Sequence, residues 1–354
     1  MPKITINKRD IGNTNRTYII AEMSANHNQS YEKAVQIVKA AKAAGADAIK
    51  LQTYTPDTIT LNCNNDHFRI KKTIWKGKNL YELYEEAYTP WEWQPKLKNI
   101  ADDLGMDLFS TPFDDSAVDF LETMDVPAYK IASFELIDTG LLEKVAATGK
   151  PVIMSTGMAT LGEIDEAVMT LKKNGCKEIA LLKCTSAYPA SPDEANLKTI
   201  PHLSATFNVP AGLSDHTIGS SVSIAAVTLG ASIIEKHFCL DRSDPGPDSA
   251  FSMEPHEFKQ MVHDIRTVEK ALGTISYDLT ENQKISRTFR RSLFAVQDIS
   301  RGEILTEKNI RSIRPGNGLD PKHLKTIIGM KSKQKIQKGT PIDWSLVTSN
   351  QTRN

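Results

Sequence analysis

The sequence predicts a (β/α)8 barrel followed by a small domain of short strands and turns. A chain of 354 residues has room for one large domain and one small one. Through most of its length one unit repeats: a short apolar run, a polar turn, and a segment with the apolar period of a helix. Eight such units in about 240 residues match the number and length that a barrel requires.

The eight apolar runs are too short for stable helices and are rich in Ile, Leu, Val and Phe, as expected of strands buried on both faces. Their starts lie 21 to 31 residues apart, except for one gap of 60 between the second and the third. That spacing is what a strand–helix unit needs. The predicted strands cover residues 18–24, 47–53, 107–113, 128–133, 151–156, 179–185, 210–215 and 232–238.

The segments between the strands are amphipathic. In residues 31–44, apolar side chains fall on one face of a helix, and Gly45 follows where the helix should end. A doubly wound open sheet is the alternative architecture. It is disfavoured because no G-x-G-x-x-G motif follows the first strand and because eight even repeats favour closure.

The long gap, residues 54–106, mixes aromatic and basic residues. Two interpretations remain open. The segment is either a lid over the substrate or an extra helical hairpin with no contact to it.

Composition excludes several classes of protein. Lys and Arg number 43 and Asp and Glu 43, so no general nucleic-acid or membrane-surface partner is expected. The chain lacks an apolar run long enough to span a membrane and a segment resembling a secretory signal. Its four cysteines form no C-x-x-C pair and are expected to be free thiols. We therefore expect a soluble, cytoplasmic protein.

Polar side chains recur at the carboxyl end of every predicted strand. Catalysis in a barrel takes place at this end, and a polar residue inside an apolar run is costly unless it is partnered. The recurrence of polar residues at the same position of all eight strands therefore indicates an active site. The polar residues are Glu22, Lys50, Gln52, Thr111, Lys130, Ser133, Ser155, Thr156, Lys183, Thr185, Ser186, Ser214, Asp215, His216, Glu235, Lys236 and His237.

Two lysines and several hydroxyls among them predict an anion pocket. Lys50 and Lys130 supply the charge, while Ser133, Ser155 and Ser214 lie near turns that open helices. Such a set suits a phosphate monoester that also carries a carboxylate.

Two histidines predict a metal site. His216 and His237 end the seventh and eighth strands, which are neighbours in a barrel, so their rings are expected to converge. With one carboxylate from Glu22, Asp215 or Glu235 they would make a site for a divalent first-row metal.

The pattern changes after the last amphipathic helix. We assign residues 1–272 to the barrel, 273–290 to a polar linker and 291–354 to the small domain. A turn at residues 314–318 carries Arg314, which is either a surface charge or an arginine delivered to the barrel mouth of the same or another subunit.

Ordered motifs along nearly the whole chain resemble the sialic acid synthase family, which joins a catalytic barrel to an antifreeze-like (SAF) domain. They include "IAEMSANHN", "YKIAS", "STGMA", "LKCTSAYPA", "GLSDHT", "EKHF", "PGPDSAFSM" and "RRSLFA". Within the family, "LQTYTPDTITL" and the tryptophan-rich segment after it look most like the branch that forms pseudaminic acid. In the neuraminate-forming branch we expect asparagine at the position of Ser186.

The resemblance implies condensation of phosphoenolpyruvate with an open-chain N-acetylated sugar, giving a nonulosonic acid and phosphate. For the pseudaminic branch the sugar is 2,4-diacetamido-2,4,6-trideoxy-altropyranose; N-acetylneuraminate and legionaminate synthases are the alternatives. It also implies a domain-swapped homodimer and a divalent metal, Mn²⁺ first, with Mg²⁺ or Co²⁺ as alternatives.

The resemblance assigns roles to individual residues. Glu22, His216 and His237 are expected to be catalytic, the two histidines as metal ligands. The residues expected to hold phosphoenolpyruvate are Lys50, Thr111, Lys130, Ser133, Ser155, Ser186 and Ser214. Those expected to face the sugar are Gln52, Glu135, Tyr188, Asp248, Phe289 and Arg314, the last from a partner subunit.

Two other classes compete. A metal-dependent aldolase on the same barrel would use the histidines and lysines but would not release phosphate from phosphoenolpyruvate. A sugar-binding module that uses the C-terminal domain leaves the eight polar strand ends unexplained.

Overall fold

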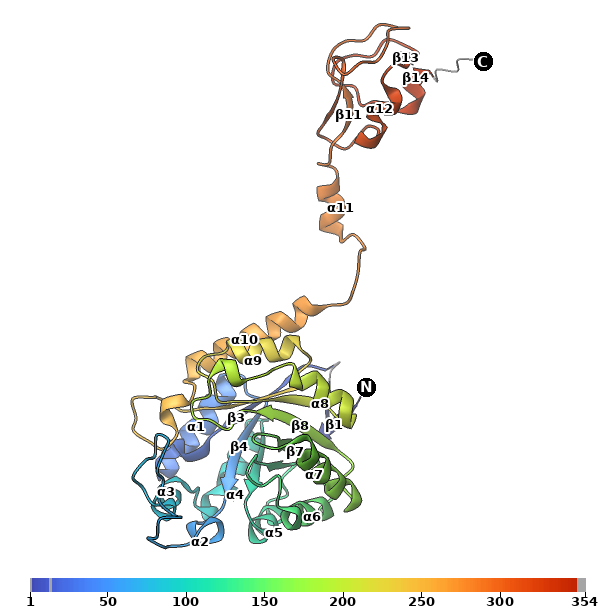
Figure 1. The fold of residues 1–354 in the computed structure, drawn as a ribbon. Helices are drawn as coiled ribbons and strands as arrows, with labels where there is room; N and C mark the ends of the chain where they lie inside the picture. The colour runs from blue at the N-terminus through green and yellow to red at the C-terminus, as the bar shows by residue number, and fades with distance from the viewer. Residues whose placement is uncertain (1, 13–14, 349–354) are drawn as a thin grey trace. The chain divides into compact units, whose positions relative to one another are not determined.

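The structure is a computed structural model that describes residues 2–12 and 15–348 (Figure 1). The chain divides into two compact units, Met1–Gly273 and Thr274–Asn354. No helix of the described residues is long and apolar enough to cross a membrane.

The first unit is the predicted barrel. Its eight parallel strands close in the order β10-β3-β4-β5-β6-β7-β8-β9. Nearly every strand residue is buried, which explains their continuous apolar runs. The strands are β3 (Tyr18–Glu22), β4 (Ala48–Thr53), β5 (Asp107–Pro112), β6 (Tyr129–Ile131), β7 (Val152–Ser155), β8 (Ile179–Cys184), β9 (Ala211–Asp215) and β10 (Ile233–His237).

Helices surround the strands of this unit (Figure 1). In α1 the predicted apolar face is buried; Ser30 accepts a hydrogen bond from the Lys33 N–H at its start, and Gly45 follows with φ +94°. The helices are α1 (Tyr31–Ala43), α4 (Gln94–Asp103), α5 (Asp115–Thr123), α6 (Thr139–Ala147), α7 (Leu161–Lys173), α8 (Thr199–Phe207), α9 (Ser221–Thr228) and α10 (Pro255–Leu272).

An antiparallel hairpin that the sequence analysis did not predict precedes the barrel. It consists of β1 (Lys3–Ile6) and β2 (Arg9–Gly12). Its isoleucines Ile4, Ile6 and Ile11 belong to the barrel core. The alternation of isoleucine with polar residues was a signal for a half-buried strand. The hairpin packs at the amino ends of the strands, where the Asn7 side chain donates to Asp107 Oδ1 at 2.5 Å.

The long gap after β4 contains two short helices, α2 (Pro56–Ile59) and α3 (Leu80–Ala87), before α4 begins. The Asn79 side chain caps α3 by accepting from the Tyr81 N–H, and the Glu82 carboxylate accepts from the Asn79 N–H. The segment is therefore helical in part, and its side chains also reach the mouth of the barrel, as described below.

The second unit has its own apolar core, which includes Leu293, Ile299 and Leu305. A helix, α11, lies within the residues expected to form the linker. The elements of this unit are α11 (Glu281–Arg287), β11 (Ser292–Ala295), β12 (Ile310–Ile313), α12 (Leu324–Ile327), β13 (Lys331–Ser332) and β14 (Val347–Thr348).

Candidate active site

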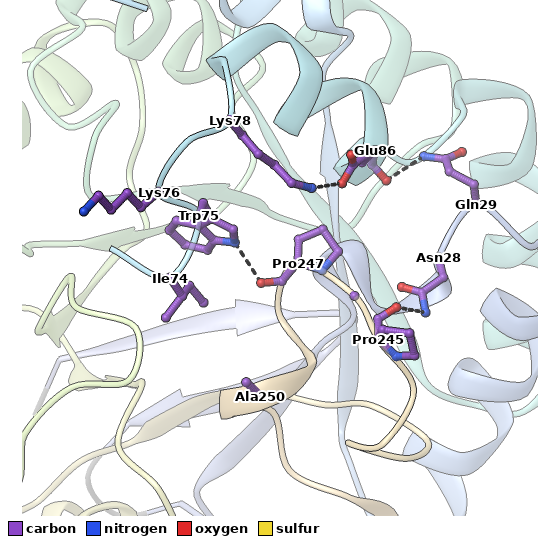
Figure 2. A pocket seen from close by; sticks show the side chains of 11 residues that line it. Asn28, Gln29, Ile74, Trp75, Lys76, Lys78, Glu86, Pro245, Pro247 and Ala250 are labelled. Carbon is purple, nitrogen blue, oxygen red and sulfur yellow. Dashed lines mark hydrogen bonds and ion pairs between the residues drawn. The ribbon is translucent and has the colours of Figure 1, made fainter. Parts of the chain in front are cut away.

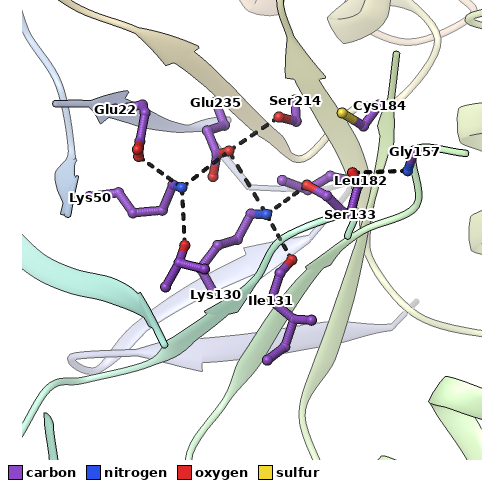
Figure 3. Close-up of polar contacts among 12 residues, drawn as sticks. Glu22, Lys50, Lys130, Ile131, Ser133, Gly157, Leu182, Cys184, Ser214 and Glu235 are labelled. Atoms are coloured by element: carbon purple, nitrogen blue, oxygen red, sulfur yellow. Dashed lines mark hydrogen bonds and ion pairs between the residues drawn. The ribbon is translucent and has the colours of Figure 1, made fainter. Parts of the chain in front are cut away.

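Four charged side chains form a buried network at the carboxyl ends of the barrel strands (Figure 3). Lys50 Nζ lies 2.8 Å from Glu22 Oε2 and 3.6 Å from Glu235 Oε1. Lys130 Nζ lies 3.9 Å from the same Glu235 oxygen. They come from β3, β4, β6 and β10, so the network exists only because the barrel closes.

The two carboxyl groups of the network differ in proton affinity. Burial raises the pKa of Glu22 to about 7 in spite of its ion pair with Lys50. Burial also favours the neutral form of Glu235, but the ammonium groups of Lys130 and Lys50 outweigh it and hold the pKa of Glu235 below its ordinary value. Glu22 is therefore suited to proton transfer near neutral pH. When Glu22 is protonated, the ammonium groups of Lys50 and Lys130 face only the Glu235 carboxylate. The network then carries a net positive charge and can bind an anion.

Hydroxyl groups and one backbone N–H lie beside this network. Lys130 Nζ donates to Ser155 Oγ at 2.6 Å, and the Gly157 N–H donates to Ser133 Oγ at 3.1 Å. A Cβ at Gly157 would lie 2.2 Å from Ser186 Oγ and 2.7 Å from Ser133 Oγ, so no larger residue fits there. Small groups that can donate thus converge next to a lysine, an arrangement that suits phosphate oxygens.

The two histidines converge as the barrel register predicted. The ring centroids of His216 and His237 lie 5.3 Å apart. His216 Nδ1 lies 2.9 Å from the Thr185 carbonyl oxygen, which leaves Nε2 free to act as a ligand. His237 Nδ1 is buried and has no hydrogen-bond partner. Burial, followed by the charge of His216, holds the pKa of His237 well below its ordinary value.

A cavity of about 350 Å³ opens next to His237. One side of it is polar. Gln52 Nε2 donates to Glu22 Oε1 and to Ser24 Oγ, both at 2.9 Å, and Ser24 in turn donates to Asp248. The other side carries aromatic and aliphatic side chains from the segment after β4, together with Phe113 and Phe134.

Comparisons with known proteins agree with this geometry. The NeuB family model matches residues 37–277, and the SAF domain model matches residues 290–348. The chain belongs to the NeuB family. The family predicted from the motifs is therefore confirmed, and this NeuB-family protein is a phosphoenolpyruvate-condensing synthase, an enzyme of the transferase type.

Two relatives and one solved structure show how far the likeness extends. Pseudaminic acid synthase of Helicobacter pylori is 47% identical over 92% of this chain and 96% of its own. Pseudaminic acid synthase of Campylobacter jejuni (strain 81-176) is 47% identical over 93% of this chain and 97% of its own. The crystal structure of the spore coat polysaccharide biosynthesis protein SpsE from Bacillus subtilis is 31% identical over 98% of this chain and 99% of that one, with a TM-score of 0.68.

Most residues that the sequence predicted for the site do gather at the mouth of this NeuB-family barrel. Thr111 accepts from Lys50 Nζ at 3.2 Å, and Ser214 donates to Glu235 Oε1 at 3.1 Å. Tyr188 covers His216, with ring centroids 4.4 Å apart. Glu135 lines the cavity. Burial raises its pKa to about 7.

Several predicted residues do not join the site in the first unit, and Lys236, which donates to Asp215 and to the Thr217 carbonyl, is one of them. Asp215 was a candidate metal ligand, and this was wrong: its carboxylate accepts from Lys236 at 2.9 Å and from Ser223 and Thr217. Successive strand residues point to opposite faces, so Asp215 faces the helices while Ser214 faces the mouth. Phe289 and Arg314 belong to the second unit, where both are exposed, and their role towards the sugar stays a prediction.

Sequence reasoning missed several residues of the site. Ser24 and Cys184 carried signals, because Ser24 lies two residues after the end of β3 and Cys184 ends β8. Cys184 Sγ lies 3.9 Å from His216 Nδ1. Tyr54, Trp75 and Tyr84 carried only a collective signal, the aromatic composition of the long segment, because the path of that segment decides which of its residues reach the cavity.

A second, outer cavity of about 600 Å³ borders the first (Figure 2). The two share Trp75 and Pro247, and Trp75 Nε1 donates to the Pro247 carbonyl at 2.9 Å. The Trp75 ring also lies 5.8 Å from that of Tyr188. The segment after β4 thus covers part of the mouth, which favours the interpretation as a lid.

Enzymes of the NeuB family use a divalent metal. No group of three or more His, Cys, Asp or Glu side chains in the described ranges, 2–12 and 15–348, is arranged to hold one. His216 and His237 nevertheless fit as a pair, because one presents a free Nε2 and the other an unpartnered buried Nδ1. A site with two protein ligands leaves positions for water and substrate oxygens.

Proposed function

We propose that this NeuB-family enzyme is a pseudaminic acid synthase. It would condense phosphoenolpyruvate with 2,4-diacetamido-2,4,6-trideoxy-altropyranose, in its open-chain aldehyde form, to give pseudaminic acid and phosphate. The likeness to two pseudaminic acid synthases over nearly the full length of each chain carries this proposal.

The charged network supports a place for phosphoenolpyruvate. Lys50 and Lys130 would neutralise its phosphate and carboxylate. Hydroxyl donors close to them would bind the remaining oxygens, with the Gly157 N–H beside them. These hydroxyls belong to Thr111, Ser133, Ser155, Ser186 and Ser214.

His216 and His237 would hold the divalent metal, Mn²⁺ first, with Mg²⁺ or Co²⁺ as alternatives. A bound metal supplies Lewis-acid polarisation of an aldehyde oxygen. His237 lines the cavity, with its ring 5.0 Å from that of Phe251, and His216 lies beside it, with ring centroids 5.3 Å apart. Their place supports a sugar aldehyde bound between the metal ligands and phosphoenolpyruvate.

Glu22 would move the proton. The C3 carbon of phosphoenolpyruvate adds to the aldehyde carbon, and water adds to the resulting cation at C2. Phosphate then leaves the tetrahedral intermediate by C–O cleavage as C2 becomes the keto carbon. The second proton of the water, released in that collapse, balances the proton that the aldehyde oxygen takes up to become a hydroxyl group. Glu22 accepts the first proton of that water and returns it to the departing phosphate, a role that its pKa of about 7 supports. Gln52 Nε2 orients its carboxyl group.

The sugar would contact Gln52, Glu135, Tyr188 and Asp248 in the cavity, with Phe289 and Arg314 arriving from the partner of a domain-swapped homodimer. Exposed apolar side chains in the loops after β6, β7 and β9 support a covered mouth. They are Phe134, Ile137, Met158 and Ile218, which are 59%, 66%, 62% and 57% exposed. A chain truncated before residue 290 should lose activity while its barrel folds; an active truncation would overturn this part of the proposal.

The test is phosphate release from phosphoenolpyruvate with Mn²⁺, measured in parallel with the diacetamido-trideoxy-altrose and with N-acetylmannosamine. We expect turnover with the first sugar alone. Turnover with N-acetylmannosamine alone would make the enzyme an N-acetylneuraminate synthase, and turnover with neither sugar would indicate another amino-sugar, as in a legionaminate synthase. Cleavage of a nonulosonic acid with no phosphate chemistry would indicate a metal-dependent aldolase.

A further inference from the structure

The cavity next to His237 has one strongly apolar side. We define the apolar wall as Tyr54, Ile59, Leu83, Tyr84 and Phe113, which line the cavity together. Tyr54 is its centre: its ring lies 5.5 Å from that of Tyr84 and 5.1 Å from that of Phe113, both edge to face. Aromatic pairs with this geometry stabilise one another and make a firm surface.

Local structure holds the wall in place. Leu83 is the buried residue of α3, and the capping box at Asn79 fixes where that helix begins. The Trp91 indole N–H donates to the Tyr54 carbonyl at 3.0 Å, which ties the wall to the start of α4. The wall is therefore a built surface.

The polar atoms of the wall are two phenol hydroxyls. Neither Tyr54 nor Tyr84 makes a side-chain hydrogen bond to another residue within the described parts of the chain, although Tyr54 is 2% exposed. Burial raises the pKa of both phenols, so both are neutral and can donate. Neither phenol oxygen is among the buried atoms of the described residues that lack a hydrogen-bond partner, so both are open to the cavity and can donate to a bound ligand. Acetamido carbonyl oxygens are acceptors of the right kind.

We infer that the apolar wall determines which sugar the enzyme accepts, by packing against the C6 methyl group and the C4 acetamido methyl group of the substrate. This inference rests on the proposed function. The aldehyde end of the sugar then lies toward His237 and Gln52, on the polar side of the same cavity. The two phenol hydroxyls donate to acetamido carbonyl oxygens.

The enzyme would discriminate between sugars because part of the apolar wall has no hydrogen-bonding groups. Hydroxyl groups at C4 and C6 of an ordinary N-acetylhexosamine would face Ile59, Leu83 and Phe113, which offer no hydrogen bond. Burying a hydroxyl without a partner costs binding, while a methyl group gains from the same contact. Rejection of a substrate that differs by one group in an apolar pocket is about 10- to 200-fold.

The test compares three sugars on four proteins. The sugars are the diacetamido-trideoxy-altrose, the same sugar with a C6 hydroxyl, and N-acetylmannosamine. The variants are Leu83→Ser, Ile59→Ser and, as the matched control on the exposed face of α3, Glu85→Ser. We measure kcat/KM for each sugar by phosphate release, together with KM for phosphoenolpyruvate.

We expect the wild type to prefer the C6 methyl sugar to its C6 hydroxyl analogue by roughly 50-fold. Leu83→Ser and Ile59→Ser should each reduce this ratio by about fivefold or more, with KM for phosphoenolpyruvate unchanged, and Glu85→Ser should leave the ratio as it is. An unchanged KM for phosphoenolpyruvate shows that the barrel of a variant has folded. Ile59→Ser, at the end of the short helix α2, tests the wall independently if Leu83→Ser fails to fold.

The outcomes separate the two proposals. Wild-type turnover of N-acetylmannosamine alone would overturn the proposed function, and the wall inference with it. A selective wild type whose ratio survives in both variants would overturn the wall inference and leave the proposed function standing. An equal loss for the methyl and hydroxyl sugars would also overturn it, because the wall would then position any sugar alike.

Discussion

Charged side chains lie at both ends of the barrel, buried at the carboxyl ends of the strands and partly buried at the amino ends, but their hydrogen-bonding groups are satisfied differently. At the amino ends of the strands, Asp47 accepts from Arg9 at 2.7 Å, from Arg266 at 3.1 Å and from the Ile19 N–H at 2.9 Å. Asp107 accepts from the Tyr18 hydroxyl at 2.5 Å. Among these groups only Arg266 Nε is a buried atom without a hydrogen-bond partner. This end is closed.

At the carboxyl ends of the strands, several buried polar atoms have no hydrogen-bond partner within the protein. Buried atoms there without a hydrogen-bond partner are Glu22 Oε2, Glu135 Oε2, Glu235 Oε2 and His237 Nδ1, although ion pairs hold two of the carboxylates. Unsatisfied buried groups cost stability. The same residue types therefore serve stability at one end and remain available to substrate at the other, as the general division of a barrel implies.

The largest effect is expected from Glu22→Gln. Removing the group with a pKa of about 7 from the mouth should lower kcat for phosphate release about 1,000-fold, because proton transfer is lost. The midpoint of unfolding should not fall, because Lys50 keeps Glu235 as a partner. The matched control is Asp215→Asn, a buried carboxylate on the helix side of β9, which should lower stability far more than kcat. A kcat of Glu22→Gln within tenfold of the wild type would remove Glu22 from the mechanism.

At the opposite end, Asp47→Asn should destabilise the fold by about 3 kcal/mol, because Arg9 and Arg266 lose a charged partner in a largely buried setting. Urea denaturation measures the loss, and kcat at a temperature where the variant is folded should stay within about twofold of wild type. A variant of full stability and low kcat would contradict the division between the two ends.

The metal ligands come third. His216→Ala and His237→Ala should each weaken Mn²⁺ binding by about 100-fold, measured by calorimetry without substrate. A chelator should abolish phosphate release, and added Mn²⁺ should restore it. His256→Ala, at an exposed position of α10, serves as the control. Unchanged Mn²⁺ affinity in both active-site variants would place the metal elsewhere.

The smallest effect is expected from Glu135→Gln, through pH. Burial raises the pKa of Glu135 from 4.5 to about 7, so the folded state binds this proton more tightly than the unfolded state does. The wild type therefore loses stability as pH rises from about 4.5 through about 7. The variant lacks this loss and should be more stable above pH 7 by on the order of 1–2 kcal/mol, with no difference near pH 4.5. The melting temperatures of the wild type and the variant, measured across this pH range, test the prediction. A difference between them that is the same at all pH values would contradict it.

The sequence predicted the barrel because local periodicity reports burial. Apolar runs and amphipathic segments depend on neighbours a few residues apart. The adjacency of successive strands in a barrel then predicted that His216 and His237, which end neighbouring strands, would meet. Among the three carboxylates left open as metal ligands, Asp215 could have been set aside from the sequence, since the alternation that turns Ser214 inward turns its neighbour outward. The hairpin before the barrel carried the same alternation over four residues and was overlooked.

Family, fold class and the polar residues at the strand ends were thus determined by the sequence alone. The tertiary structure decided the proton affinities of Glu22 and Glu235, because these depend on charges from four strands that only closure brings within 4 Å. It also decided the apolar wall. Four of its residues, Tyr54, Ile59, Leu83 and Tyr84, lie in the long segment after β4, which has no repeating pattern, and Phe113 joins them from directly after the end of the next strand. Periodicity describes which face of an element is buried, whereas a binding cavity depends on where long connections run through space.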